Sequence, residues 1–248
     1  FDFTTNTLVA GVDYRLADNW ILGGSLSASQ AEADQEARPD QTELDQSAIS
    51  VFGSLYGDQY YVDALLSYGD NQYDMVRSVM TGAGDAQVVK SLANADTKGS
   101  ELSFGLGAGY QLDFKTQQLK FFTRLDYIDV DVEGYSEFSG DDTMFVAQIN
   151  DFKIKSFTSN LGVSYALIVN TGFGVLTPEF GLDYEHQFEN DGFNVDGQFV
   201  GGQAGEFSIS TYDKDANYYN ANFALNAVFQ QGFSAFISYT DQFGREAE

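Results

Sequence analysis

The sequence of 248 residues contains no cysteine, a single histidine and two prolines. The absence of cysteine excludes disulfide frameworks, thiolate metal sites and cysteine nucleophiles. With His186 as its only histidine, the chain cannot supply a site that needs two imidazole groups. No apolar run approaches the roughly 18 residues of a membrane-spanning helix, so no such helix is expected.

Basic side chains are also scarce, since 12 Lys and Arg stand against 37 Asp and Glu, a formal net charge of -25. Nucleic-acid binding needs Lys and Arg clustered against phosphates, so no nucleic-acid partner is expected. The same deficit disfavours docking on an anionic membrane surface through a basic face.

Aromatic residues and glycine are abundant, with 22 Phe, 15 Tyr and 25 Gly. This composition, with so little proline, favours many strands. Apolar and polar residues alternate with a period of two along the whole chain. The clearest stretch is 102–112, where one face reads Leu, Phe, Leu, Ala, Tyr, Leu and the other Ser, Gly, Gly, Gly, Gln.

The alternation predicts an all-β chain of ten strands. No shift in composition divides the sequence, so residues 1–248 are expected to form one domain. The expected strands are 7–16, 20–33, 45–57, 60–77, 99–113, 119–133, 152–169, 174–188, 217–229 and 232–243.

Two properties of these strands favour a membrane barrel over a soluble sandwich. The apolar face carries aromatic residues near the strand ends, such as Trp20, Tyr60 and Tyr110, where interfacial girdles lie in membrane barrels. The opposite face is rich in Gly, Ser, Asn and charge, which suits a wet lumen and not a dry core. A soluble up-and-down barrel with its apolar face inward fits less well. We therefore predict an antiparallel up-and-down transmembrane β-barrel.

The connections alternate in length, which predicts how the barrel is oriented. Outer-membrane barrels have short periplasmic turns and long extracellular loops. The first and last predicted strands would then both have their free ends at the cell surface, whereas an even-stranded barrel has its termini in the periplasm. We expect one further strand before Phe1 and one after Glu248, so that ten of twelve strands are present. The long connections are 34–44, 78–98, 134–151 and 189–216.

The strands also carry motifs whose order and spacing resemble those of a known family. Taken together, they resemble the translocator (β) domain of bacterial monomeric autotransporters, which belong to type V secretion. The family's first strand, with its helical linker, and its last strand are absent, which are the two strands that the loop pattern leaves out. The matching segments are 11–16 (Gly-Val-Asp-Tyr-Arg-Leu), 19–23, 60–69 with Tyr73 and Arg77, 102–112, 176–185 and 233–243.

The resemblance implies a bacterial outer-membrane protein that is not an enzyme and needs no cofactor. Such a barrel would give an upstream passenger a hydrophilic pore and anchor it at the surface. The implied partners are the chain's own passenger or linker, the barrel-assembly machinery, and outer-membrane lipid with lipopolysaccharide.

Charged residues at inward positions of the predicted strands are the candidate pore lining. They would hold a passing chain in a hydrated lumen, and their pairing across the lumen would set its width; equally, they would be a solvated lumen that keeps the barrel closed. No catalytic or metal-binding residue is assigned. The nine candidates are Asp13, Arg15, Asp63, Lys120, Arg124, Asp126, Glu179, Asp183 and Glu185.

Two other functions remain open. A barrel without a passenger would act as an adhesin or surface-complex component through its acidic loops at 30–45, 134–151 and 189–216. His186 beside Asp183 and Glu185 is similar to the omptin surface proteases, but no second acidic pair matches, and an ordinary surface histidine is favoured.

Acidic clusters and glycines on these strands have simpler interpretations. Divalent binding is conceivable at Asp129, Asp131 and Glu133 or at Asp141 and Asp142, but neither has the spacing of a Ca²⁺ loop, and solvated acidic segments are favoured. The inward glycines at 105, 107 and 109 are expected to leave room for an inward aromatic ring such as that of Phe122.

Overall fold

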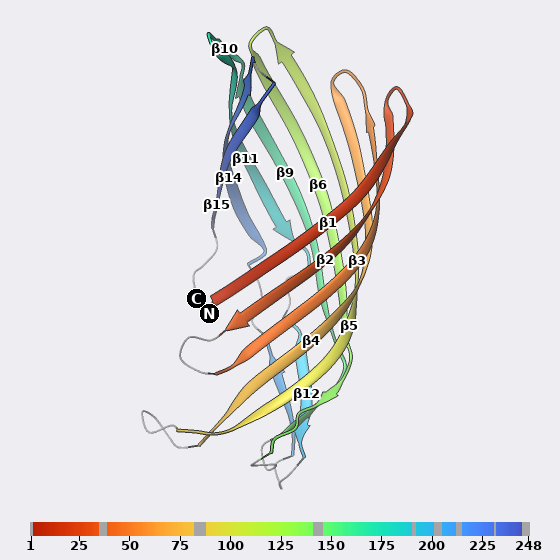
Figure 1. The fold of residues 1–248 in the computed structure, drawn as a ribbon, viewed down its shortest axis with the longest axis vertical. Coiled ribbons are helices and arrows are strands. Elements are labelled where there is room, and N and C mark those ends of the chain that lie inside the picture. The colour runs from red at the N-terminus through yellow and green to blue at the C-terminus, as the bar shows by residue number, and fades with distance from the viewer. Residues whose placement is uncertain are drawn as a thin grey trace.

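The computed structural model describes residues 2–34, 39–81, 88–140, 146–189, 192–200, 205–211, 215–230 and 232–244. No helix within these ranges is long and apolar enough to cross a membrane. Ten long antiparallel strands dominate the structure (Figure 1). They are β1 (Asp2–Ala17), β2 (Trp20–Asp34), β3 (Gln41–Tyr56), β4 (Tyr60–Thr81), β5 (Val88–Phe114), β6 (Gln117–Val132), β9 (Phe152–Leu167), β11 (Gly174–Gln187), β14 (Asn217–Phe229) and β15 (Ser234–Phe243).

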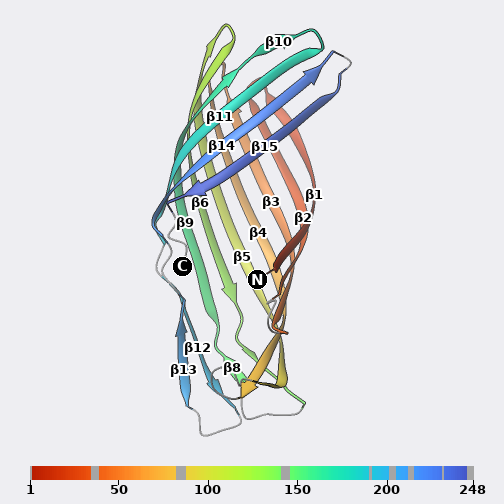
Figure 2. The same cartoon turned by 90° about the vertical axis from the view of Figure 1, so that its left-hand side faces the viewer.

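The ten strands pair in chain order, from β1 at one edge of the sheet to β15 at the other. The short strand β10 (Val169–Thr171) pairs with β11 beside β9. The sheet curls into a trough, and β1 and β15, its two edges, do not pair with each other in the described ranges (Figures 1 and 2). The predicted all-β, up-and-down arrangement of ten strands is therefore confirmed.

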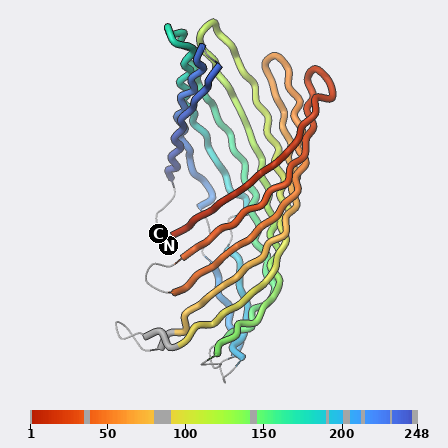
Figure 3. The backbone as a smooth tube through the Cα atoms, in the orientation of Figure 1, coloured from red at the N-terminus to blue at the C-terminus, as the bar shows by residue number. Residues whose placement is uncertain are grey.

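The connections divide the molecule into two ends. Short turns join β1 to β2, β3 to β4 and β5 to β6 at one end, and the longer connections lie at the other (Figure 3). We call these the short-turn end and the long-loop end. The alternation that the sequence predicted is present in the fold.

The long connections themselves are more ordered than predicted. Residues 134–151 and 189–216, expected as loops, contain β7 (Tyr135–Ser136), β8 (Ala147–Ile149), β12 (Asn194–Phe199) and β13 (Glu206–Ser210). These strands form a second sheet in the order β13-β12-β8-β7 beyond the long strands (Figure 2). The four strands of the second sheet are so short that they give too few alternating positions for a period of two to be recognised. The loop expected at 78–98 is also wrong, because β4 continues to Thr81 and β5 begins at Val88.

The buried apolar residues lie mainly in this long-loop region. Val79, Ala93 and Val146 form a small cluster in which each residue is at most 5% exposed. Nearby, the Arg77 guanidinium donates two hydrogen bonds to the Glu137 carboxylate, with Nε 2.7 Å from Oε1. The second sheet is thus packed and ion-paired against the extended β4–β5 hairpin.

The convex face of the long strands has the opposite character. Leu26 is 63% exposed, Leu106 38% and Ile237 66%. Exposed apolar side chains that alternate with polar ones on the other face are the pattern of a lipid-facing wall. The apolar surface of the wall therefore faces outward.

An aromatic row crosses the convex face towards the long-loop end. Its rings form two runs of contacts between β6 and β15, Tyr127–Phe157–Phe188–His186 and Tyr184–Tyr219–Phe243, with centroid separations between 4.5 and 6.3 Å. Aromatic rings are enriched at the boundary between hydrocarbon and headgroups. The aromatic row consists of Tyr127, Phe157, Phe188, His186, Tyr184, Tyr219 and Phe243.

Candidate functional site: the polar concave face

Polar side chains from several strands border a cleft on the concave face. Its volume is about 650 Å³. Strand alternation sends every second side chain to this face, so the residues between the apolar convex positions meet here. The polar and charged residues whose side chains border it are Ser54, Asp63, Lys120, Arg124, Ser164, Glu179, Asp183, Asn222 and Thr240.

All nine charged residues proposed from the sequence occupy concave-face positions. The cleft brings five of them together, namely Asp63, Lys120, Arg124, Glu179 and Asp183. Asp126 and Glu185 are next to members of this group, whereas Asp13 and Arg15 lie apart on β1, where the Arg15 guanidinium is 5.8 Å from the centre of the Tyr56 ring. Their contribution to a pore stays a prediction.

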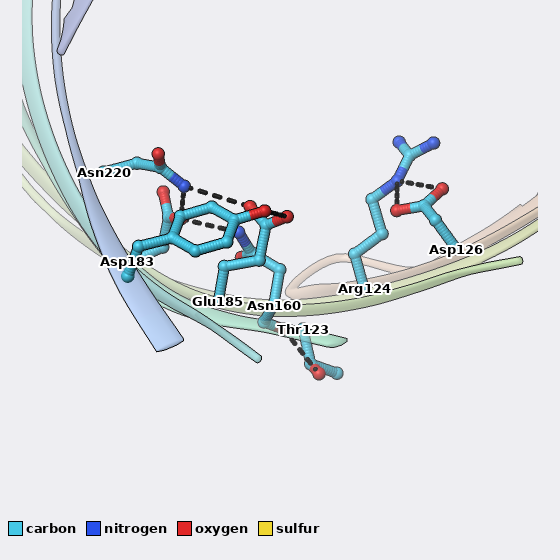
Figure 4. Close-up of polar contacts among 8 residues, drawn as sticks. Thr123, Arg124, Asp126, Asn160, Asp183, Glu185 and Asn220 are labelled. Atoms are coloured by element: carbon cyan, nitrogen blue, oxygen red, sulfur yellow. Dashed lines mark hydrogen bonds and ion pairs between the residues drawn. The ribbon is translucent and has the colours of Figure 1, made fainter. Parts of the chain in front are cut away.

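The ion pair within this set is local. Arg124 Nε donates to both carboxylate oxygens of Asp126, at 2.8 and 2.6 Å (Figure 4). The two residues are neighbours on one face of β6, and a Cβ added to Gly105 on β5 would lie 3.2 Å from Asp126 Oδ1. This ion pair joins two residues of one strand, and the expected pairing across the lumen stays a prediction.

A carboxylate–amide cluster spans β9, β11 and β14. Asp183 Oδ2 accepts hydrogen bonds from the side-chain amides of Asn160 at 2.5 Å and Asn220 at 2.7 Å (Figure 4). The Asn220 amide is also 3.2 Å from Glu185 Oε2, and the buried Tyr218 hydroxyl donates to the other oxygen of Glu185. Asn160 Oδ1 is buried and has no hydrogen-bond partner in the described ranges.

Sequence reasoning identified the two acids of this cluster and missed the residues that hold them. Asp183 lies opposite Asn220, and Glu185 lies opposite Asn160 and Tyr218. Those pairings depend on the register between strands, which one sequence does not specify. One signal was available in the sequence. By alternation, Asn160, Tyr218 and Asn220 all occupy inward positions of their predicted strands.

Inward aromatic rings lie over glycines of neighbouring strands. The Tyr61 ring covers Gly109, and the Phe122 ring covers Gly162. The Lys120 ammonium is 4.7 Å from the centre of the Tyr61 ring. Glycine was expected to make room for such rings, but Phe122 uses a glycine on β9 and not those on β5.

Replacing Gly162 with alanine is expected to lower the free energy of unfolding by about 1–3 kcal/mol, because the Phe122 ring already fills the space above this glycine. The new Cβ would lie 2.3 Å from Phe122 Cζ and 2.7 Å from the Asp183 Cβ. Gly181→Ala is the matched control, since its Cβ would meet Ser164 and Asn222 at 3.6 Å. Urea titration in lipid vesicles measures both, and equal losses would contradict the ring-over-glycine contact.

His186 lies on the opposite face from the acids beside it. Its ring packs against Phe188 in the aromatic row, and its Nδ1 is 2.9 Å from Asn217 Oδ1. Asp183 and Glu185 face the concave side. His186 and these two acids therefore cannot act together, and the geometry offers no support for the omptin-like arrangement.

The acidic clusters considered for divalent ions do not converge. Asp131 accepts a hydrogen bond from Lys153, and Asp129 accepts one from the Tyr127 hydroxyl at 3.0 Å. Asp141 and Asp142 lie outside the described residues. Within the parts of the chain that the structure describes, no three acidic or histidine side chains are grouped to hold a metal ion.

Comparison with known proteins identifies the family of this chain. The model of the family "Autotransporter beta-domain" matches residues 1–240. The chain belongs to the autotransporter β-domain family. The "translocator domain of autotransporter NalP" from Neisseria meningitidis has the same fold, with a TM-score of 0.68 and 15% identity over 98% of this chain and 76% of that one.

Curated relatives extend the comparison to longer proteins. An "uncharacterized protein in trpE-trpG intergenic region" of Pseudomonas putida is 27% identical over 83% of this chain and 33% of its own length. "Lipase 1" of Photorhabdus luminescens is 23% identical over 94% of this chain and 35% of its own length. This β-domain thus spans about a third of the length of these relatives.

Membership of the family places the β-domain in the outer membrane. Its convex face then contacts lipid and its concave face forms the wall of the lumen. The short-turn end faces the periplasm, and the long-loop end, with the second sheet, faces the outside.

Neutralising the two lumen acids as Asp183→Asn with Glu185→Gln is expected to reduce the preference of the purified β-domain for cations over anions. Six of the nine charged concave-face candidates are acidic, and rings of acidic side chains favour cations. Both replacements keep oxygen acceptors for Asn160 and Asn220. The reversal potential in a planar bilayer under a KCl gradient measures the change. Asp45→Asn on the convex face of β3 is the control, and an unchanged potential in the double variant would contradict the expectation.

Proposed function

We propose that this β-domain carries a linked passenger across the outer membrane through its polar lumen and anchors it at the cell surface. The observation that supports this is the polar concave face, along which hydrophilic groups from β4, β6, β9, β11 and β14 follow one another. An extended hydrated chain can exchange hydrogen bonds with such a face without entering lipid. The greater length of the curated relatives leaves room for a passenger in the full protein.

The barrel needs no cofactor or energy source in this proposal. Strand pairing satisfies the backbone groups of the wall in lipid. The edges of β1 and β15 have no partner in the described ranges, and such edges are costly in a bilayer. They support the expectation of two closing strands, for a barrel of twelve. Insertion by the barrel-assembly machinery is part of the proposal and rests on the resemblance alone.

The test is surface display of the full-length gene product. An epitope tag placed upstream of residue 1 is expected to be cleaved by protease added to intact cells. The same tag in a gene truncated before β14 is expected to stay protected, because the wall can no longer form. A tag that stays inside the cell while the barrel is folded in the outer membrane would overturn the proposal.

A second candidate function rests on the sheet formed by β7, β8, β12 and β13. Its packed contacts with the β4–β5 hairpin make it an ordered surface at the extracellular end. A barrel that acts through this surface as an adhesin or as part of a surface complex would keep its activity when all upstream sequence is deleted. Binding of such cells to a host or abiotic surface separates the two functions.

A further inference from the structure

The few basic side chains of this acidic β-domain are unevenly distributed. Arg15, Lys120 and Arg124 lie on the concave face, and Arg77 is paired with Glu137 in the long-loop region. Lys115 lies in the short turn between β5 and β6. The other lysines whose side chains the structure describes all face outward near the extracellular end of β5 and β9, the two strands that flank β6, and they are Lys98, Lys153 and Lys155.

Lys153 and Lys155 occupy successive convex positions on β9. On the same face as Phe157 of the aromatic row, Lys155 lies about 7 Å and Lys153 about 13 Å from that residue along the strand, for a rise near 3.3 Å per residue. Asp131 lies opposite Lys153, and Asp129 lies opposite Lys155. The two ammonium groups are thus displayed immediately beyond the hydrocarbon boundary that the aromatic row marks.

The contacts of the two lysines leave them accessible. Lys153 Nζ is 2.5 Å from Asp131 Oδ2, whereas Lys155 Nζ is 4.0 Å from Asp129 Oδ2. The lysine side chains are 55% and 47% exposed. The hydrogen bond to Asp131 raises the pKa of Lys153, so its ammonium stays charged at physiological pH. Exposed pairs of this kind are weak, so a stronger anion can displace the aspartates.

We propose that Lys153 and Lys155, with Lys98 on β5 across β6 from them, bind the phosphate groups of a glycolipid headgroup in the outer leaflet. Ammonium groups at headgroup level attract anionic lipid phosphates. The rings of Tyr127 and Phe157 beneath them pack against the acyl chains. The site rests on the outer-membrane location of the β-domain and is independent of any passenger.

The occupant is a lipid because the site stands at the membrane boundary on the lipid-facing wall. Outward positions at this height on β3 and β4 carry Asp45, Asp70 and Asp74 with no lysine among them, whereas Asp129 and Asp131 on β6 each lie opposite a lysine of β9. A phosphate-bearing lipid is therefore directed to the β5–β6–β9 part of the wall. Divalent cations could bridge phosphates to acidic groups elsewhere, so the test is made in EDTA.

The test compares lipid binding by the full-length protein in detergent, using native mass spectrometry. The probes are diphosphoryl lipid A and the same lipid with its phosphates removed. The phosphorylated form is expected to bind about tenfold or more tightly, and Lys153→Gln with Lys155→Gln removes that difference. Asp129→Asn with Asp131→Asn is expected to strengthen binding, because the lysines lose their competing partners. Lys115→Gln is the matched control at the periplasmic end.

Several outcomes would overturn the site. Equal binding by the double lysine variant, equal binding of the dephosphorylated lipid, or binding that appears only with added Mg²⁺ each excludes lysine-based recognition. Displacement by millimolar inorganic phosphate would show a free-anion site and not a lipid site. Heat-modifiable migration in gels checks folding, and the single Lys155→Gln variant replaces the double one if that fails to fold. Surface display of the passenger tag is scored in the same strains, so failure of the translocator proposal is seen separately.

Discussion

Replacing Leu106 with arginine is expected to lower the free energy of unfolding of the β-domain by about 2–4 kcal/mol, the cost of a cation on the lipid face near the middle of the bilayer. Leu106 lies on the convex face of β5, where it is 38% exposed and paired with Ala64 and Leu125 on the adjacent strands. Lipid cannot solvate the guanidinium at this depth, so the folded state loses stability. Urea titration in lipid vesicles measures the loss.

The matched control is Gly107→Arg, one residue further along β5. A Cβ at Gly107 would meet Thr123 O at 3.9 Å and the Asp63 Cβ at 4.0 Å, which are ordinary contacts. The side chain would enter the water-filled lumen beside the Asp63 carboxylate. The free energy of unfolding is therefore expected to fall by much less than in Leu106→Arg. Equal losses at the two positions would show that the two faces of β5 do not divide lipid from water.

Replacing Arg77 with methionine is expected to open the second sheet at the extracellular end. The Glu137 side chain is 8% exposed, and its carboxylate would lose both hydrogen bonds from the guanidinium. Removing one partner of a buried pair costs about 3–5 kcal/mol, and the half-exposed guanidinium reduces this to about 2 kcal/mol. Hydrogen exchange at the Ala147 amide, which donates to Glu137 Oε2 at 2.8 Å, measures the opening.

The compensating variant is Arg77→Met with Glu137→Gln. Glutamine removes the buried charge and keeps an oxygen for the Ala147 amide, so most of the lost protection is expected to return. The barrel itself is expected to unfold as in the wild type, because the pair lies outside the membrane-spanning part. Exchange as fast in the double variant as in Arg77→Met alone would show that charge burial is not the cause.

The long strands could be predicted because each lies between lipid and water. That environment imposes strict alternation, as in residues 102–112, and the predicted strands correspond to those of the structure. The second sheet is not in that environment. Its strands are as short as β7 (Tyr135–Ser136), and the pairing of β8 with β12 joins segments about fifty positions apart, such as Gln148 with Gln198.

The candidate site, like the fold, could be predicted from the sequence only in part. Parity alone placed Asp183 and Glu185 on the concave face. It could not specify that Asn160 and Asn220 hold Asp183, because this follows from the register of β9 and β14 with β11. Parity also could not predict which glycine the Phe122 ring covers, because that depends on which of the two neighbouring strands the ring lies over.

The central claim is that the concave face is the path of the passenger. A photo-crosslinking amino acid at Asn222, which borders the lumen cleft, tests it in cells that are secreting the full-length protein. The same amino acid at Phe223, the next residue and 49% exposed on the convex face, is the control. The account predicts crosslinks to upstream sequence from position 222 and to lipid or nothing from position 223. Passenger crosslinks from 223 and none from 222 would contradict it.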